Sequence, residues 1–273
     1  MMPRRASKPI QIGGVTVGGQ APIVVQSMTK TDTRDVAATV KQIEELAEHG
    51  CELVRMAVPD GEAAQAIGAI KRAVSIPLIA DIHFDHRLAL AALEAGVDGL
   101  RLNPGNIGRR EEVEAVARAA RKRGVPIRIG LNAGSLPRGR GEGETVAEHM
   151  VKAALEQVRI LEGMDFDLIK VSLKAFDVPT TIEAYRSIAP KIAYPLHLGI
   201  TEAGTPRAGA IRSAIGLGIL LHSGIGDTLR VSLTGHPRHE VTAAYEILRS
   251  LNLRQRGPTL ISCPTCGRIE VEN

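Results

Sequence analysis

Five positively charged side chains each interrupt a short run of aliphatic residues. They are Arg55 in Leu-Val-Arg, Arg101 in Leu-Arg-Leu, Arg128 in Ile-Arg-Ile, Lys170 in Ile-Lys-Val and Arg230 in Leu-Arg-Val. A cation buried among aliphatic residues is costly unless it is paired, and a single one usually forms a structural ion pair. Five at matching positions favour a shared role, and guanidinium forks suit phosphate oxygens. The pattern therefore predicts a site for phosphate or diphosphate.

Several acidic residues follow the same runs and could balance part of this charge: Asp81, Asp85, Glu202 and Asp227. Asp81 and His83 lie on one face of an extended segment, which suits acid–base work or a metal, although a loop histidine with ordinary hydrogen bonds is the commoner case. Glu202 follows an apolar run that ends in Gly-Ile-Thr and is the better acid–base candidate.

Two further features could take part in the chemistry. Two glycine-containing loops are expected, one from Asn103 to Gly108 and one from Asn132 to Ser135. Their backbone N–H groups could cradle an anion, although any fold needs tight loops. Lys170 or Lys174 could alternatively form a Schiff base, as in aldolases.

The three cysteines are not a disulfide framework, and an odd number suits a reducing cytosol. Cys263 and Cys266 have a spacing typical of iron or zinc ligands. They make only half a site, because Cys51 precedes a strand and is expected at the opposite end of the fold. Half of a zinc knuckle and a redox dithiol are the alternatives.

The composition is that of an ordinary globular protein. The 273 residues are 44% hydrophobic and 2% aromatic with no tryptophan, so the core must be aliphatic and base-stacking platforms are disfavoured. A net charge of +4 is too small to indicate nucleic-acid binding. No apolar run is long enough to cross a membrane, and the basic N-terminus lacks the apolar stretch of a secretory signal. We expect a cytoplasmic enzyme with no nucleic-acid or membrane partner.

Eight aliphatic runs alternate with segments of helical periodicity. The runs are 22–28, 52–59, 76–84, 99–104, 126–132, 168–173, 195–200 and 228–233, and the helical segments are 36–50, 63–74, 87–95, 113–120, 145–161, 180–188, 210–222 and 240–251. Eight such units in about 250 residues favour a (β/α)8 barrel. The alternative, an open doubly wound sheet, usually carries a glycine-rich fingerprint after its first strand, where Met28–Thr33 stands here.

The barrel is expected to occupy residues 1–257. A short β-hairpin at 10–17 precedes it, and its position suggests that it closes the bottom of the barrel. The cationic residues would then converge on the mouth, where active sites of such barrels lie.

The chain resembles the 4-hydroxy-3-methylbut-2-en-1-yl diphosphate synthase family of the methylerythritol phosphate pathway. The motifs that carry the resemblance span the chain: Pro-Ile-Val-Val-Gln-Ser-Met-Thr from Pro22, Ala-Asp-Ile-His-Phe from Ala80, Arg-Leu-Asn-Pro-Gly-Asn-Ile-Gly from Arg101, Gly-Leu-Asn-Ala-Gly-Ser from Gly130, His-Leu-Gly-Ile-Thr-Glu-Ala-Gly from His197, Gly-Ile-Gly-Asp-Thr-Leu-Arg-Val-Ser-Leu-Thr from Gly224 and Ile-Ser-Cys-Pro-Thr-Cys-Gly-Arg from Ile261.

The resemblance implies a reductive ring opening. The family converts 2-C-methyl-D-erythritol 2,4-cyclodiphosphate into (E)-4-hydroxy-3-methylbut-2-enyl diphosphate, with loss of water and two electrons from flavodoxin or ferredoxin. A 4Fe–4S cluster, held by three cysteines and a glutamate in a C-terminal domain, delivers the electrons. Members are homodimers in which one subunit's cluster domain covers the other's barrel.

The resemblance also implies roles for individual residues. The diphosphate-binding residues would be Arg55, Arg101, Asn103, Arg128, Asn132, Ser135 and Lys170, and Arg230 joins them from the charge pattern. Asp81, His83 and Glu202 would line the pocket, with Glu202 transferring a proton. Cys263 and Cys266 would be the first two cluster ligands.

Seven residues follow Cys266, and they include neither a third cysteine nor the fold of a cluster domain. We therefore expect residues 258–273 to be the start of an incomplete 4Fe–4S domain. By itself this chain is expected to bind diphosphate but to be inactive and to assemble no stable cluster. A redox-free phosphate-handling barrel, a lyase or a transferase such as a pterin synthase relative, is the main alternative. A third interpretation is a non-catalytic module that forms dimers.

Overall fold

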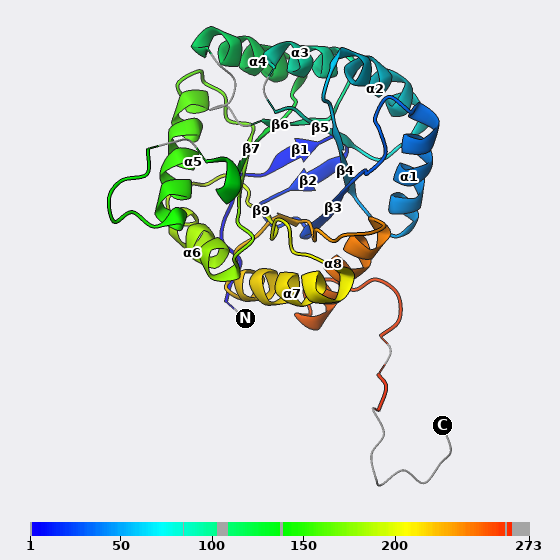
Figure 1. The fold of residues 1–273 in the computed structure, drawn as a ribbon, viewed down its shortest axis with the longest axis vertical. Helices are drawn as coiled ribbons and strands as arrows, with labels where there is room; N and C mark the ends of the chain where they lie inside the picture. Colours follow the sequence, from blue (N-terminus) through cyan, green and yellow to red (C-terminus); the bar gives the residue numbers. More distant parts are fainter. Residues whose placement is uncertain (1, 84, 103–108, 137–138, 260, 264–273) are drawn as a thin grey trace.

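The computed structural model describes residues 2–83, 85–102, 109–136, 139–259 and 261–263, and within them parallel strands alternate with helices around a ring (Figure 1). The strands of the ring are β3 (Val24–Met28), β4 (Leu53–Ala57), β5 (Leu78–Asp81), β6 (Gly99–Leu102), β7 (Ile127–Asn132), β8 (Ile169–Lys174), β9 (His197–Leu198) and β10 (Thr228–Leu229). The helices are α1 (Val36–Glu48), α2 (Gly61–Ala73), α3 (His86–Glu94), α4 (Arg110–Arg123), α5 (Val146–Glu162), α6 (Val178–Ile188), α7 (Pro206–His222) and α8 (Arg238–Ser250).

The ring is closed. The strands pair in the order β8-β7-β6-β5-β4-β3-β10-β9, and a parallel bridge between Val171 and Leu196 joins β8 to β9. The predicted (β/α)8 barrel is therefore confirmed, and the open-sheet alternative is wrong. The last two strands are shorter than expected, although the Arg230 N–H still donates to the Leu198 carbonyl at 3.0 Å.

The predicted N-terminal hairpin closes the bottom of the barrel. Strands β1 (Ile10–Ile12) and β2 (Val15–Val17) pair antiparallel, and their buried side chains form a small cluster with Val24, Leu53 and Ile79. Those three residues lie on the first half of β3, β4 and β5, so the hairpin covers the N-terminal ends of the strands. The opposite end is left open for the side chains that follow the strands.

Local sequence explains where several helices begin and end. The carboxylates of Asp35, Asp60 and Asp177 accept backbone N–H groups of the first turns of α1, α2 and α6, as N-cap residues do. Gly124 ends α4 in the left-handed conformation, with φ of 66°. In the described part of the chain, no helix is both long and apolar enough to cross a bilayer.

Two acidic residues that we expected near the cations are elsewhere. Asp85 caps α3 and forms an ion pair with Arg87 at 2.8 Å. Asp227 comes immediately before β10, and therefore lies at the bottom of the barrel beside Arg4. The expectation was wrong for Asp85, which belongs to a helix start. Asp227 belongs to a strand start and does not line the mouth, although its charge partly offsets the lowering of the Lys170 pKa by burial and by Arg128.

Candidate active site at the barrel mouth

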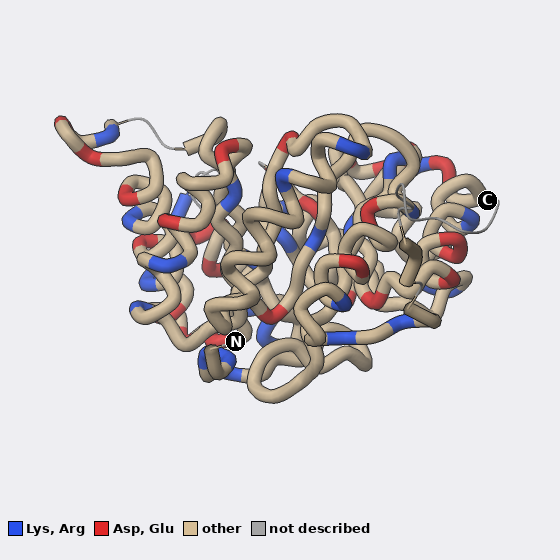
Figure 2. The backbone as a smooth tube through the Cα atoms, turned by 90° about the horizontal axis from the view of Figure 1, so that it is seen from below, with Lys and Arg blue, Asp and Glu red and all other residues tan. Residues whose placement is uncertain are grey.

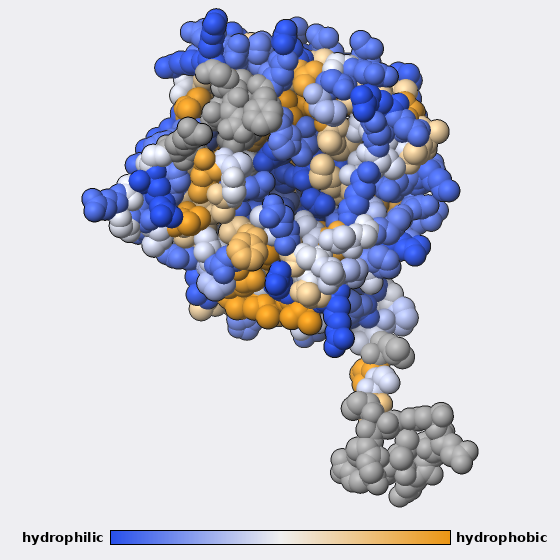
Figure 3. Space-filling model, viewed as in Figure 1, coloured by the Kyte–Doolittle hydropathy of each residue, from blue (hydrophilic) through white to orange (hydrophobic). Residues whose placement is uncertain are grey.

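The C-terminal ends of the strands surround a polar cavity of about 90 Å³. Its lining residues are Arg55, Asp81, His83, Arg101, Arg128, Asn132, Ser172, Lys174, Thr201, Arg230 and Ser232. Figure 3 shows this mouth as a strongly hydrophilic hollow in the middle of the face, and the side view of Figure 2 shows Lys and Arg positions interspersed with Asp and Glu along the backbone. Four of the five predicted strand cations meet here.

Asp81 organises two of these cations. Its carboxylate, on the last residue of β5, lies 3.4 Å from Arg55 Nε and accepts from Arg101 Nη1 at 3.2 Å. Burial by itself disfavours the charged carboxylate, but the charge of Arg55, the hydrogen bond from His83 and the charge of Arg101 hold the pKa of Asp81 well below its usual range. Asp81 is therefore an ionised structural partner at neutral pH.

His83 completes this corner of the mouth. Its Nε2 lies 3.5 Å from the Asp81 carboxylate and 3.5 Å from Arg101 Nη1, and its side chain is half-exposed. The predicted grouping of Asp81, His83, Arg55 and Arg101 is thus present in space.

Gly130 makes room for Arg101. The Arg101 Nη2 donates to the Gly130 carbonyl at 2.8 Å, and a Cβ atom placed on Gly130 would come within 2.5 Å of Arg101 Nε. A side chain on this position of β7 would displace the guanidinium, so the glycine is part of the cation site.

Arg128, like Lys170, is a buried cation whose side chain has no hydrogen bond or ion pair among the described residues. Its side chain is buried, and Nε and Nη1 have no acceptor among the described residues. Burial, and then the nearby charges of Arg55 and Arg101, lower the pKa of Arg128 well below its ordinary value. These free donors beside the mouth are suited to an incoming anion.

Lys170, which we expected at the mouth, does not line it, whereas Lys174, named only as an alternative Schiff-base lysine, does. Lys170 pairs in register with Arg128 but is buried and is not part of the cavity lining, whereas Lys174 is. The strands of a barrel tilt by about 36° from its axis. Residues that pair across adjacent strands therefore lie at different heights along the axis, and Lys170 lies further from the mouth than Arg128 does. Four residues later in β8, Lys174 returns to the level of the mouth.

Lys174 is held by β9 and β10. Its Nζ lies 3.2 Å from His197 Nε2, and His197 Nδ1 lies 2.7 Å from Thr228 Oγ1. A Cβ on Gly199 would approach Lys174 Nζ to 2.5 Å, so this glycine also vacates space for a cation. Burial and then the charges of Arg128 and Arg55 lower the pKa of Lys174 well below 10.5.

The remaining predicted residues are more scattered. Asn132 lines the cavity, and Ser135 is exposed on the short 3-10 turn that follows, with its Oγ 3.4 Å from the Asn132 carbonyl. Glu202 is exposed in a left-handed turn, with φ of 51°, next to the lining residue Thr201. Asn103 lies outside the described residues. Ser172, Thr201 and Ser232 also line the cavity; the sequence places each of them at a polar strand end, but it assigned none of them a role.

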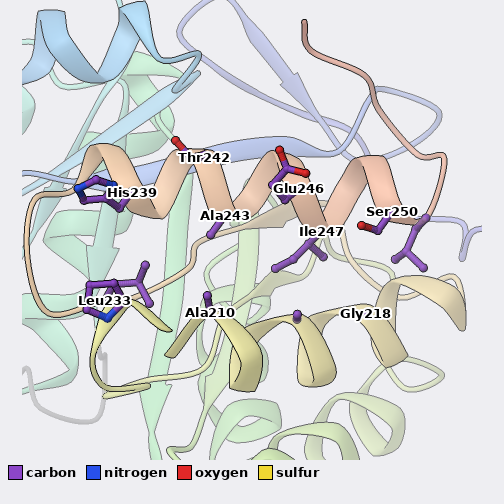
Figure 4. Close-up of a pocket in the computed structure, with 12 residues that line it drawn as sticks. Ala210, Gly218, Leu233, His239, Thr242, Ala243, Glu246, Ile247 and Ser250 are labelled. Atoms are coloured by element: carbon purple, nitrogen blue, oxygen red, sulfur yellow. The ribbon is translucent and has the colours of Figure 1, made fainter. Parts of the chain in front are cut away.

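A larger cavity of about 490 Å³ lies on the outside of the barrel between α7 and α8 (Figure 4). Its walls are mainly apolar: Ala210 and Gly218 of α7 face Ala243 and Ile247 of α8. It is far larger than the mouth, but it lacks the convergent cations, and so the chemistry indicated by the sequence belongs to the mouth.

Comparison with known proteins decides the family. Residues 7–245 match the model of the GcpE TIM-barrel domain. A protein of Dehalococcoides mccartyi (strain CBDB1), named 4-hydroxy-3-methylbut-2-en-1-yl diphosphate synthase (flavodoxin), is 65% identical over 100% of this chain and 78% of its own length. The chain belongs to this family. A protein of the same name from Geobacter sulfurreducens is 62% identical over 97% of the chain and 76% of its own length.

Solved structures of a different enzyme share the fold. Dihydropteroate synthase from Stenotrophomonas maltophilia superposes with a TM-score of 0.69 over 93% of this chain and 100% of its own, at 16% identity. At that identity the likeness concerns the barrel alone.

The cysteines of this family member do not form a cluster site within the described residues, where no three His, Cys, Asp or Glu side chains come together as metal ligands. Cys263 is exposed, and Cys266 lies outside the described residues. Cys51 is buried at the bottom of the barrel, where burial raises the pKa of its thiol to about 12.

Proposed function

We propose that this barrel binds 2-C-methyl-D-erythritol 2,4-cyclodiphosphate for its reductive conversion into (E)-4-hydroxy-3-methylbut-2-enyl diphosphate. The observation that carries the proposal is the convergence of Arg55, Arg101, Arg128, Lys174 and Arg230 on one polar cavity. Asp81 can balance only part of this charge. A doubly charged cyclic diphosphate supplies the missing anions, and its oxygens suit the free donors of Arg128.

The chain's own residues would bind and orient this substrate. We assign diphosphate contacts to the lining cations and to Asn132, and the family resemblance adds Ser135, Lys170 and Asn103 as candidates. Asp81 and His83 would fix Arg101 against the ligand. Glu202 remains our candidate for proton transfer, because its turn is continuous with the lining residue Thr201.

We propose further that Cys263 and Cys266 are ligands of the family's 4Fe–4S cluster, that residues 258–273 begin the cluster domain, and that the protein works in the cytoplasm. When bound, the cluster would supply the two electrons of the reaction. The electron donor would be flavodoxin or ferredoxin, and the name of the relatives contains flavodoxin.

Calorimetric titration of the chain with the cyclic diphosphate tests the proposal. Binding is expected to take up protons at pH values between the lowered pKa of free Lys174 and its ordinary value of 10.5, because a bound anion raises that pKa back towards 10.5. Since the pKa is lower in the free protein, affinity should be greatest below that pKa and fall as pH rises towards 10.5. The ligand itself has no proton that titrates there, since each phosphorus carries a single strongly acidic group.

Titrations at a series of pH values below 10.5, each in two buffers of different ionisation enthalpy, measure the proton uptake. Lys174→Met should reduce both the uptake and the affinity, whereas Lys122→Met, on the last turn of α4, should change neither. A chain that binds no cyclic diphosphate would refute the proposed function.

We also propose that the outer face of α7 forms the contact of a homodimer. Ile211, Ile215 and Ile219 recur every four residues and are 55%, 51% and 38% exposed. Figure 3 shows apolar surface over this helix, and a single stripe of this kind can pair with its own copy about a twofold axis. A helix that is apolar on its solvent side is typical of a buried contact.

Ile215→Glu is therefore expected to convert a dimer into a monomer, as measured by light scattering after size-exclusion chromatography. At high dilution, where the wild type is also monomeric, the melting temperatures of the two proteins should be equal. Ile160→Glu, at an exposed isoleucine of α5 that is 40% accessible, is the matched control and should leave the dimer intact. Equal masses for wild type and Ile215→Glu would contradict this contact.

A further inference from the structure

A buried carboxylate, Glu240, lies behind the mouth and belongs to none of the motifs used above. It is in the first turn of α8 and is 1% exposed. Its Oε2 accepts from Ser27 Oγ at 3.1 Å and from Arg230 Nε at 3.2 Å, and its Oε1 accepts from the Leu233 N–H at 3.2 Å. Ser27 belongs to β3, whereas Arg230 and Leu233 belong to the connection between β10 and α8, so Glu240 ties that connection to β3.

Arg230 depends on this carboxylate for its direction. Its Nη2 also lies 3.4 Å from Glu240 Oε1, which makes the contact bidentate. The remaining nitrogen, Nη1, lies 3.7 Å from Met28 Sδ, and Arg55 Nη2 approaches the same sulfur at 2.8 Å. Two guanidinium groups thus lie on either side of one thioether, where their charges repel each other.

Glu240 and Asp81 form ion pairs with different cations. Asp81 contacts Arg55 and Arg101, while Glu240 contacts Arg230 and lies 3.3 Å from Lys30 Nζ. Among the described residues, Glu240 is the carboxylate that forms an ion pair with Arg230. Without it, the charge of Arg55 would push Arg230 away from the mouth.

We propose that Glu240 is a positioning residue for diphosphate binding, acting on the ligand mainly by orienting Arg230. The inference rests on the proposed function, since it requires the mouth to bind the cyclic diphosphate. Glu240 does not line the cavity itself, whereas Arg230 does. Most of its effect on affinity should therefore disappear when Arg230 is removed.

A double-mutant cycle separates this role from a structural one. The variants are Glu240→Gln, Arg230→Met and the double variant, and the readout is the dissociation constant of the cyclic diphosphate measured by calorimetry. Glu240→Gln is expected to weaken binding about tenfold in the wild-type background, because Arg230 loses a charge-assisted partner. In the Arg230→Met background the same change should alter affinity by less than about twofold.

Melting temperatures are recorded for every variant, since a general loss of packing would lower affinity in both backgrounds alike. If Glu240→Gln does not fold, Glu240→Asp keeps the buried charge at a shorter reach and should weaken binding about threefold, again mainly with Arg230 present. Equal losses in both backgrounds, or wild-type affinity for the Glu240 variants, would overturn the inference. Those results leave the proposed function standing, whereas an absence of binding by the wild-type chain overturns both.

Discussion

Replacing Arg128 with methionine is expected to weaken binding of the cyclic diphosphate roughly thirtyfold or more, corresponding to about 2 kcal/mol or above for loss of a buried charged donor. The same change should leave the ligand-free barrel as stable as before or more stable. Arg128 is buried beside Arg55 and Arg101, and two of its nitrogens have no acceptor in the described structure. In the absence of ligand its charge is a cost, and an apolar side chain of similar length removes that cost.

The variant should lose affinity without losing stability, whereas a variant that disrupts the fold would lose both. Calorimetry gives the affinity, and urea unfolding of the ligand-free chain gives the free energy of unfolding. Arg128→Lys keeps the charge without the fork and should fall between wild type and Arg128→Met. Arg118→Met removes an exposed arginine of α4, 73% accessible and paired with Glu114, and should change neither quantity. Loss of stability together with affinity in Arg128→Met would show that the arginine supports the fold instead.

Much of this site could be predicted from the sequence, because the signal is local. A cation within an aliphatic run marks a strand residue that cannot face the helices, and Arg55, Arg101, Arg128 and Arg230 all line the mouth. The alternation of short apolar runs with helical stripes likewise predicted the closed barrel. Family resemblance then supplied the substrate, which the residues alone describe only as a multiply charged anion.

The levels of the two lysines could not be predicted, because they depend on the tilt of the strands. Lys170 shares its register with Arg128, so its sequence context resembles that of the lining cations. Only the stagger around the closed ring places Lys174 at the mouth and Lys170 below it. The partner of Arg230 was also hidden, since Glu240 stands in a stretch whose pattern indicates an ordinary amphipathic helix.

The fourth acidic residue, Asp227, supports the fold instead of the site, and its removal is expected to have the largest effect on stability. Its carboxylate is 2% exposed and accepts from Arg4 Nη2, Ser7 Oγ and the Leu196 N–H, each at 2.8 Å. Asp227→Ala should lower the free energy of unfolding by about 3–5 kcal/mol, because it leaves buried donors and a partly buried guanidinium without their shared acceptor.

The contacts of Asp227 with Arg4 and Ser7 join the N-terminal arm, residues 2–9 before β1, to the start of β10. The arm and the carboxylate should therefore act as one unit. Urea unfolding at pH 7 measures the loss, and Asp167→Ala is the control, because that exposed carboxylate pairs with Lys8 at the same end of the barrel and should contribute less than about 1 kcal/mol. Removing residues 1–7 should also destabilise the barrel, and combining the deletion with Asp227→Ala should cost less than the sum of the two. Additive losses, or a loss in Asp227→Ala no larger than in Asp167→Ala, would mean that the arm does not lock the bottom of the barrel through this carboxylate.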